Sequence, residues 1–93
     1  MATTFQESTE NQSWLKCRLD KGMFTDERAV TYPPEGAIQK SVFVPATVVE
    51  MLGDHNGRVR VRIVVRDGRT FAVLPSANRD IVSVIRDQDV SNE

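Results

Sequence analysis

Five arginines in one short stretch are the side chains of this sequence most able to do chemistry. They are Arg58, Arg60, Arg62, Arg66 and Arg69, and Asp67 is the only acid among them. A guanidinium group offers planar, bidentate donors that suit a phosphate group. Alternate residues of a strand lie about 6.6–7 Å apart on one face, which is close to the spacing of phosphates along a single nucleic-acid strand. The pattern therefore makes nucleic acid a candidate partner.

A solvated strand face explains the same arginines without any ligand. Long arginine side chains cover apolar surface and discourage pairing between exposed strand edges. Proteins that bind single strands interleave aromatic residues with their charges, and this strand carries none. The nearest aromatic residue, Phe71, is predicted by its alternation to lie in the core. Because the sequence pI is only about 5.8, we favour a solvated face and keep nucleic acid as the alternative.

No other set of residues has the composition of a catalytic or metal site. Cys17 is the only cysteine and His55 the only histidine, and a cysteine nucleophile needs a nearby base to form its thiolate. Cys17 alternates with leucines, so we interpret it as a small buried hydrophobic residue. Asp87 and Asp89 are spaced like part of a calcium loop, but the glycine and terminal glutamate of that motif are missing. We expect no catalytic residue, no metal and no cofactor, and so no enzyme.

Most aromatic residues of a domain this small are needed for burial. Tyr32 is the one that we single out for binding, because its strand is short and its hydroxyl must meet water or a partner. With Phe24, in the corner formed by residues 21–24, it marks a candidate interaction groove. The partner expected there is an unknown protein.

Short strands must position these residues, because alternation with a period of two dominates the chain after residue 13. Residues 58–66 are the clearest strand, with Val59, Val61, Ile63 and Val65 on one face and the arginines on the other. Asp67–Gly68 is a strong signal for a two-residue hairpin turn, and residues 69–74 form the returning strand. Further strands are expected at residues 14–19, 28–32, 37–44 and 81–85. Residues 46–52 are expected to form one or two helical turns.

The composition favours one small soluble domain. The chain has 93 residues, of which 40% are hydrophobic and 27% charged, with a net charge of -1. No window approaches the roughly 18 apolar residues needed to cross a bilayer, so no membrane association is expected. We expect a disordered tail over residues 1–12, a domain over residues 13–90 and a frayed end over residues 91–93. The first residues lack the basic start and apolar run of a secretory signal, which favours a bacterial-type cytoplasmic protein.

The arrangement of these strands resembles a small SH3-like barrel. The resemblance rests on the corner at residues 21–24, the Asp67–Gly68 hairpin and the last strand after a loop. Residues 21–30, 41–49 and 69–75 are similar to a family of uncharacterised small bacterial proteins with this layout. The resemblance implies a fold with many unrelated uses and supplies no catalytic residue.

A second resemblance covers residues 41–53, which are similar to the AbrB/MazE swapped-hairpin DNA-binding pattern. In that pattern a strand ends in proline, a short helix ends in Leu-Gly, and a hairpin follows, for which residues 59–75 are available. The likeness implies an intertwined homodimer that uses basic residues on DNA. The chain departs from it by having extra strand-like segments at residues 14–32 and 81–85. It also lacks a compact Gly-Asp turn directly before residue 58.

Taken together, these patterns predict an all-β domain, a small SH3-like barrel of five to six short antiparallel strands with a short helical turn. We expect a monomeric interaction module that binds a protein. Nucleic-acid binding through the arginine face and an AbrB-like DNA-binding regulator or antitoxin are the alternatives.

Overall fold

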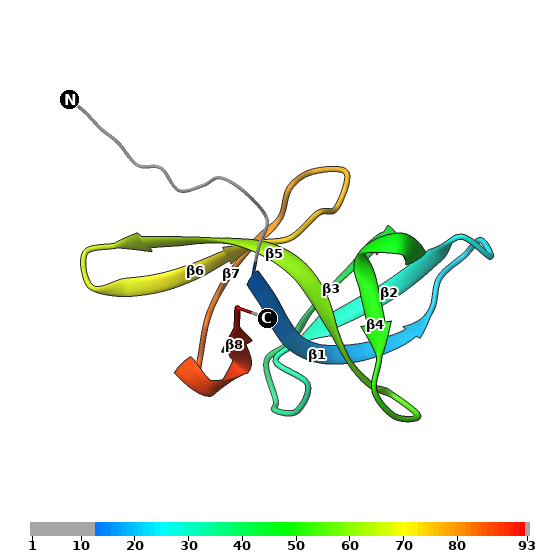
Figure 1. Ribbon diagram of the computed structural model, residues 1–93, viewed down its shortest axis with the longest axis horizontal. Coiled ribbons are helices and arrows are strands. Elements are labelled where there is room, and N and C mark those ends of the chain that lie inside the picture. Colours follow the sequence, from blue (N-terminus) through cyan, green and yellow to red (C-terminus); the bar gives the residue numbers. More distant parts are fainter. Residues whose placement is uncertain (1–12, 93) are drawn as a thin grey trace.

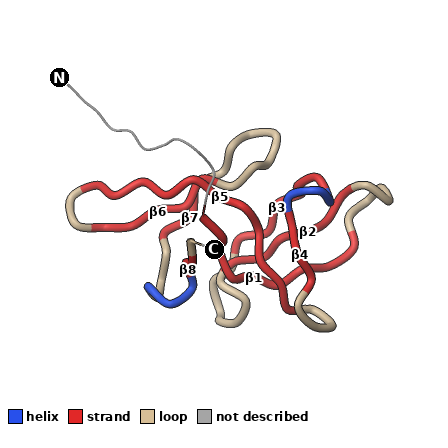
Figure 2. Tube along the Cα trace, viewed as in Figure 1, coloured by secondary structure: helices blue, strands red, loops and turns tan. Residues whose placement is uncertain are grey.

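The computed structural model describes residues 13–92 (Figure 1), so the expected tail at residues 1–12 lies outside the described part. Strands make up almost all of its regular structure (Figure 2). The strands are β1 (Ser13–Lys21), β2 (Glu27–Tyr32), β3 (Lys40–Pro45), β4 (Val49–Met51), β5 (Asn56–Arg66), β6 (Arg69–Val73), β7 (Ile81–Ser83) and β8 (Val90–Ser91). Two single turns of 3-10 helix, η1 (Ala46–Val48) and η2 (Asp87–Asp89), complete it.

Six of the strands form one antiparallel sheet in the order β3-β2-β1-β5-β6-β7, which curls into a nearly closed barrel. β4 pairs with β5, and β8 pairs with β1. The prediction of an all-β antiparallel barrel is confirmed. β1 and β2, which a swapped-hairpin protein does not need, lie within this sheet.

The long strand β5 joins the two halves of the barrel. Its first half pairs with β1 on one edge and with β4 on the other, and its second half pairs with β6. Gly57 faces inward at the point where β1, β4 and β5 meet, opposite Cys17 and Met51. A Cβ atom there would lie 2.6 Å from the Glu50 carbonyl oxygen and would clash with the Leu19 side chain. A residue without a side chain therefore lets the three strands approach each other.

Alternation along the strands builds the core. In β1 the inward residues Leu15, Cys17 and Leu19 are buried, while Lys16 and Arg18 between them are exposed. In β5 the same alternation buries Val59 and Val61. The core cluster consists of Leu15, Cys17, Leu19, Val30, Tyr32, Val44, Val59, Val61, Ala72, Leu74 and Val82.

Several sequence-based expectations differ from the structure. The helical segment of residues 46–52 is a single 3-10 turn, after which the chain extends as β4, because this segment pairs with β5. β3 begins at Lys40 rather than at residue 37. At the carboxyl end, where we expected order to stop at residue 90, Ser91 belongs to β8, and the Ser13 hydroxyl donates a hydrogen bond to Asn92 Oδ1 at 3.1 Å.

Two polar contacts connect elements that do not pair with each other in the sheet. Lys40 in β3 and Asp80, just before β7, form an ion pair of 3.5 Å between the two ends of the strand order. Inside the barrel, the Tyr32 hydroxyl donates to Asp89 Oδ2 at 2.6 Å and accepts from the Ile85 amide at 2.9 Å. Tyr32 is 2% exposed and Asp89 3% exposed. The Arg86 guanidinium lies 3.3 Å from the second oxygen of Asp89. These bonds attach the segment from β7 to β8 to the inner face of β2.

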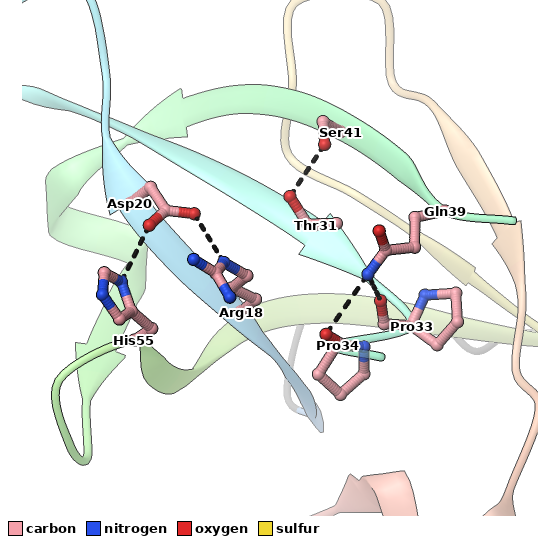
Figure 3. A network of polar contacts seen from close by, with 8 residues as sticks. All are labelled: Arg18, Asp20, Thr31, Pro33, Pro34, Gln39, Ser41 and His55. Atoms are coloured by element: carbon pink, nitrogen blue, oxygen red, sulfur yellow. Dashed lines mark hydrogen bonds and ion pairs between the residues drawn. The ribbon is translucent and has the colours of Figure 1, made fainter. Parts of the chain in front are cut away.

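Replacing Tyr32 by Phe will lower the free energy of unfolding by about 1–3 kcal/mol, because it removes the donor to Asp89 and the acceptor of the Ile85 amide inside the core. Urea denaturation followed by circular dichroism measures this change. The control is Thr31→Val on the same strand, which removes the exposed hydrogen bond of 2.7 Å to Ser41 (Figure 3). Its effect is expected to stay within about 0.5 kcal/mol. Equal destabilisation in the two variants would contradict a special role for the buried link.

Burial, reinforced by the hydrogen bond to Asp89, raises the pKa of Tyr32 above its ordinary value. A raised pKa in the folded state means that the neutral phenol is the stabilising form. Its contribution is complete below the unfolded pKa of about 10 and disappears as pH rises through the higher folded-state pKa. Since Tyr32 is the only tyrosine, absorbance at a phenolate wavelength follows this group alone. The midpoint is expected at higher pH in native protein than in urea, and coincident midpoints would refute the assignment.

Candidate functional site

The five arginines of the sequence pattern lie on the outer face of β5 and β6. Alternation along β5 leaves Arg58 and Arg60 half-buried and Arg62 and Arg66 exposed, while Arg69 opens β6 and is also exposed. Directly opposite residues of an antiparallel pair share a face. The register therefore places Arg66 opposite Arg69, and Arg62 opposite Val73.

Trp14 lies on this arginine face, which sequence reasoning did not reveal. It is the β1 residue directly opposite Arg60. The guanidinium carbon of Arg58 lies 4.3 Å and that of Arg60 4.8 Å from the centre of the indole ring. These are cation–π distances. The register of β1 against β5 brings together residues that are far apart in sequence, and no local sequence pattern predicts that register.

Phe71 is also on this face, so the expectation that it lies in the core is wrong. The residue after it, Ala72, faces inward and is fully buried, and Phe71 itself is only partly buried opposite Val64. The β5–β6 hairpin extends away from the barrel (Figure 1). We call this surface the basic-aromatic face and define it as Trp14, Arg60, Arg62, Arg66, Arg69 and Phe71.

Three of the five arginines have no acidic partner in the described chain. In residues 13–92, Arg62, Arg66 and Arg69 form no hydrogen bond or ion pair with another side chain or with the backbone. Arg58 differs, since its Nε lies 2.6 Å from Glu50 Oε1 on β4. Asp20 and Asp89 are bound to other groups, Arg18 and Tyr32.

The second surface is a groove of about 1080 Å³ at the corner between β1 and β2. Three large apolar side chains on its lining are exposed to solvent: Met23 by 77%, Phe24 by 67% and Met51 by 49%. Lys21 and Asp54 also line it, and neither forms an ion pair within the described part of the chain. We call this surface the corner groove. It lies at the end of the long axis opposite to the β5–β6 hairpin (Figure 1).

Backbone hydrogen bonds hold the corner in shape. The Gly22 amide donates to the Glu27 carbonyl at 3.2 Å, and the Glu27 amide donates to the Phe24 carbonyl at 3.1 Å. The Glu27 carboxylate accepts from the Met23 amide at 3.0 Å. A Cβ atom on Gly22 would lie 2.7 Å from the Glu27 carbonyl oxygen, so a residue without a side chain is needed at this bend. The apolar side chains of Met23 and Phe24 are thus exposed from a bonded turn.

A charged triad borders the corner groove. Asp20 accepts hydrogen bonds from Arg18 Nε at 3.0 Å and from His55 Nδ1 at 2.9 Å, with the acid between the two donors (Figure 3). Partial burial alone would raise the pKa of Asp20, but the hydrogen bonds and charges of Arg18 and His55 lower it below its ordinary value. His55 is consequently held by an acid on the groove wall.

The structure separates the two residues of the expected interaction groove. Phe24 lies on the corner groove, as an exposed residue. Tyr32 belongs to the core and does not line this groove. Its hydroxyl, which we expected to meet water or a partner, meets Asp89 and the Ile85 amide. Sequence spacing could not identify Asp89 as its partner, because 57 residues separate the two.

Cys17 and the metal-ligand residue types form no reactive cluster in the described chain. Cys17 is 1% exposed, and burial raises the pKa of its thiol to about 12. Within residues 13–92, no three side chains of His, Cys, Asp or Glu gather where they could hold a metal ion. The same residues contain no helix with the length and apolar character to cross a membrane.

Comparison with protein families, with curated proteins and with solved structures found no match to this chain.

The thiol of Cys17 is expected to resist a disulfide reagent in the native protein and to react completely in concentrated urea, because only the thiolate attacks and burial suppresses it. Spectrophotometric thiol counting at mildly alkaline pH makes the comparison. Fast stoichiometric reaction of native protein would show that the thiol is accessible and that its structural interpretation is wrong.

Proposed function

We propose that the protein is a non-enzymatic interaction module that binds a polypeptide segment in the corner groove. The observation that carries the proposal is the exposure of Met23, Phe24 and Met51 around one concave surface. Large exposed apolar side chains gathered in one place mark interaction sites. The likeness to SH3-like barrels supports a binding role only in general, because that fold serves many functions.

The chemistry of the groove selects the kind of partner. Two methionines and one phenylalanine suit an apolar anchor side chain, since methionine adapts its shape and an aromatic ring offers a large contact area. Lys21 and Asp54, without ion-pair partners in residues 13–92, provide a polar rim of both signs. A segment with one or two large apolar residues flanked by charged residues matches this surface.

The stiffness of the corner favours binding. Because the turn at residues 22–27 is already closed by backbone hydrogen bonds, docking of a partner costs less conformational entropy. The Arg28 guanidinium adds two hydrogen bonds, to the carbonyls of Thr25 and Glu27, at 2.9 and 2.8 Å. The apolar side chains are therefore presented from a fixed backbone.

A random peptide library displayed on phage provides the probe, followed by calorimetry with the selected peptides. Phe24→Ser is expected to weaken their binding at least about tenfold, because truncating a central aromatic anchor costs about 2 kcal/mol or more. The matched control is Ile38→Ser, which removes an apolar side chain that is 88% exposed and does not line the groove. It should leave affinity unchanged.

Salt provides the second criterion. Apolar contacts are barely screened, so affinity should change less than about threefold between low and moderate ionic strength. Selected peptides whose binding survives Phe24→Ser, or a library that yields none, would refute the corner groove as the binding site.

A further inference from the structure

We propose that the basic-aromatic face binds single-stranded nucleic acid through its phosphates and bases. The β5–β6 hairpin, which carries Arg62, Arg66, Arg69 and Phe71, extends to the other end of the molecule from the β1–β2 corner (Figure 1), and no residue of the basic-aromatic face lines the corner groove. The inference is therefore independent of the proposed function.

The first observation is a pair of like charges with no compensation in the described chain. Arg66 and Arg69 lie directly opposite each other at the end of the β5–β6 hairpin. Such like-charge pairs destabilise a sheet. Asp67, between them in the turn, forms no ion pair with either one. The hairpin turn needs positive φ at Asp67 and Gly68, which are 54° and 76°, but it does not need arginines beside it. An anion that binds between Arg66 and Arg69 accounts for the presence of both arginines.

The second observation is the row along β5. Arg60, Arg62 and Arg66 share one face of the strand, on which two residues span about 6.6–7 Å. Arg62 is therefore one such step from Arg60 and two steps from Arg66, with Val64 between them. The side chains of Arg62 and Arg66 form no hydrogen bond or ion pair within residues 13–92. Backbone phosphates one and two steps apart can therefore meet these guanidinium groups, each of which offers two parallel donors.

The third observation is that flat side chains accompany the charges. Trp14 lies beside Arg60, and Phe71 lies opposite Val64, between the levels of Arg62 and Arg66. Unpaired bases stack on aromatic rings and on arginine planes. The guanidinium groups of Arg58 and Arg60 lie 4.3 and 4.8 Å from the Trp14 ring centre, so this part of the face combines an aromatic ring with cationic groups. The aromatic residues that the strand itself lacks are thus supplied by β1 and β6.

A single strand suits this face better than a duplex does. In a duplex the bases are stacked on each other and offer the protein only their edges, so Trp14 and Phe71 would have no role. The acidic net charge of the chain does not oppose this inference. The molecule extends over 43 Å, whereas charges in about 0.1 M salt are screened beyond about 10 Å, so local charges dominate.

Trp14 is the only tryptophan, and its fluorescence therefore reports directly on the face. The probes are an oligothymidine and an oligouridine of about twelve nucleotides, which is within the site size of small single-strand binders. We expect quenching of Trp14 fluorescence on addition of either probe. Comparing the affinities for the two probes shows whether the 2′-hydroxyl contributes to binding. A self-complementary DNA duplex of equal length serves as the third arm and should bind more weakly.

The arginines are tested with Arg62→Gln, Arg66→Gln and Arg69→Gln combined. We expect the affinity for oligothymidine at about 50 mM salt to fall at least tenfold. The slope of log affinity against log salt concentration should become shallower by about 0.7 for each phosphate that is no longer bound. Arg79→Gln is the control, since it removes an exposed positive charge on the loop between β6 and β7, outside both the basic-aromatic face and the corner groove. It should leave both quantities nearly unchanged. Thermal unfolding checks that all variants are folded.

Phe71→Leu separates stacking from charge. It keeps an apolar side chain opposite Val64 and should weaken oligothymidine binding about fivefold or more without changing the salt slope. Absence of binding at low salt, tighter binding of the duplex, or equal weakening in the triple arginine variant and Arg79→Gln would each overturn the proposal.

Discussion

The hydrogen bond between Tyr32 and Asp89 is the interaction on which closure of the barrel depends. Between the two ends of the strand order, β3 and β7, the Lys40–Asp80 ion pair lies on the surface, and exposed ion pairs stabilise little. The segment that follows β7 returns to β1 and covers the open end of the core, with Val90 paired to Leu15. Asp89 can be buried there because the Tyr32 hydroxyl and Arg86 satisfy its oxygens. A buried acid without these donors would be strongly unfavourable.

The bent strand β5 explains why the molecule has two separate surfaces. Its first half belongs to the barrel, where Gly57 allows β1 and β4 to approach. Its second half forms with β6 a hairpin, the arm, whose base pairs with β7 and whose tip projects beyond it. The corner groove is built on the barrel end, beside β4. The arm carries Arg62, Arg66 and Arg69 on its outer face. Val65 shows the difference: it is on the inward-facing side of the alternation, but it is 67% exposed because the core ends before the arm does.

Local pattern predicts the strands of this protein well and the contacts between them poorly. The alternation around Cys17 and Val59 and the Asp67–Gly68 turn are local signals, and each appears where expected. The position of Trp14 against Arg60, the side of the sheet on which Phe71 lies and the partner of Tyr32 all depend on register between distant strands. A shift of one residue in that register would exchange the two faces of a strand. For this reason the arginines could be found in the sequence, but their aromatic neighbours could not.

Net charge and local charge describe different properties of this chain, and the structure explains how they differ. Several acidic side chains of the barrel bind basic groups. Asp20 contacts Arg18 and His55, Glu50 pairs with Arg58, and Asp80 pairs with Lys40. Three arginines without partners in the described residues lie together on the arm, where the strand register places two of them directly opposite each other. The pI of about 5.8 reflects all charges of the chain. Those charges are spread over a distance several times the length at which physiological salt screens them. A chain with acidic overall charge can therefore present one strongly basic face, because the β5–β6 hairpin carries a single acid, Asp67 in its turn.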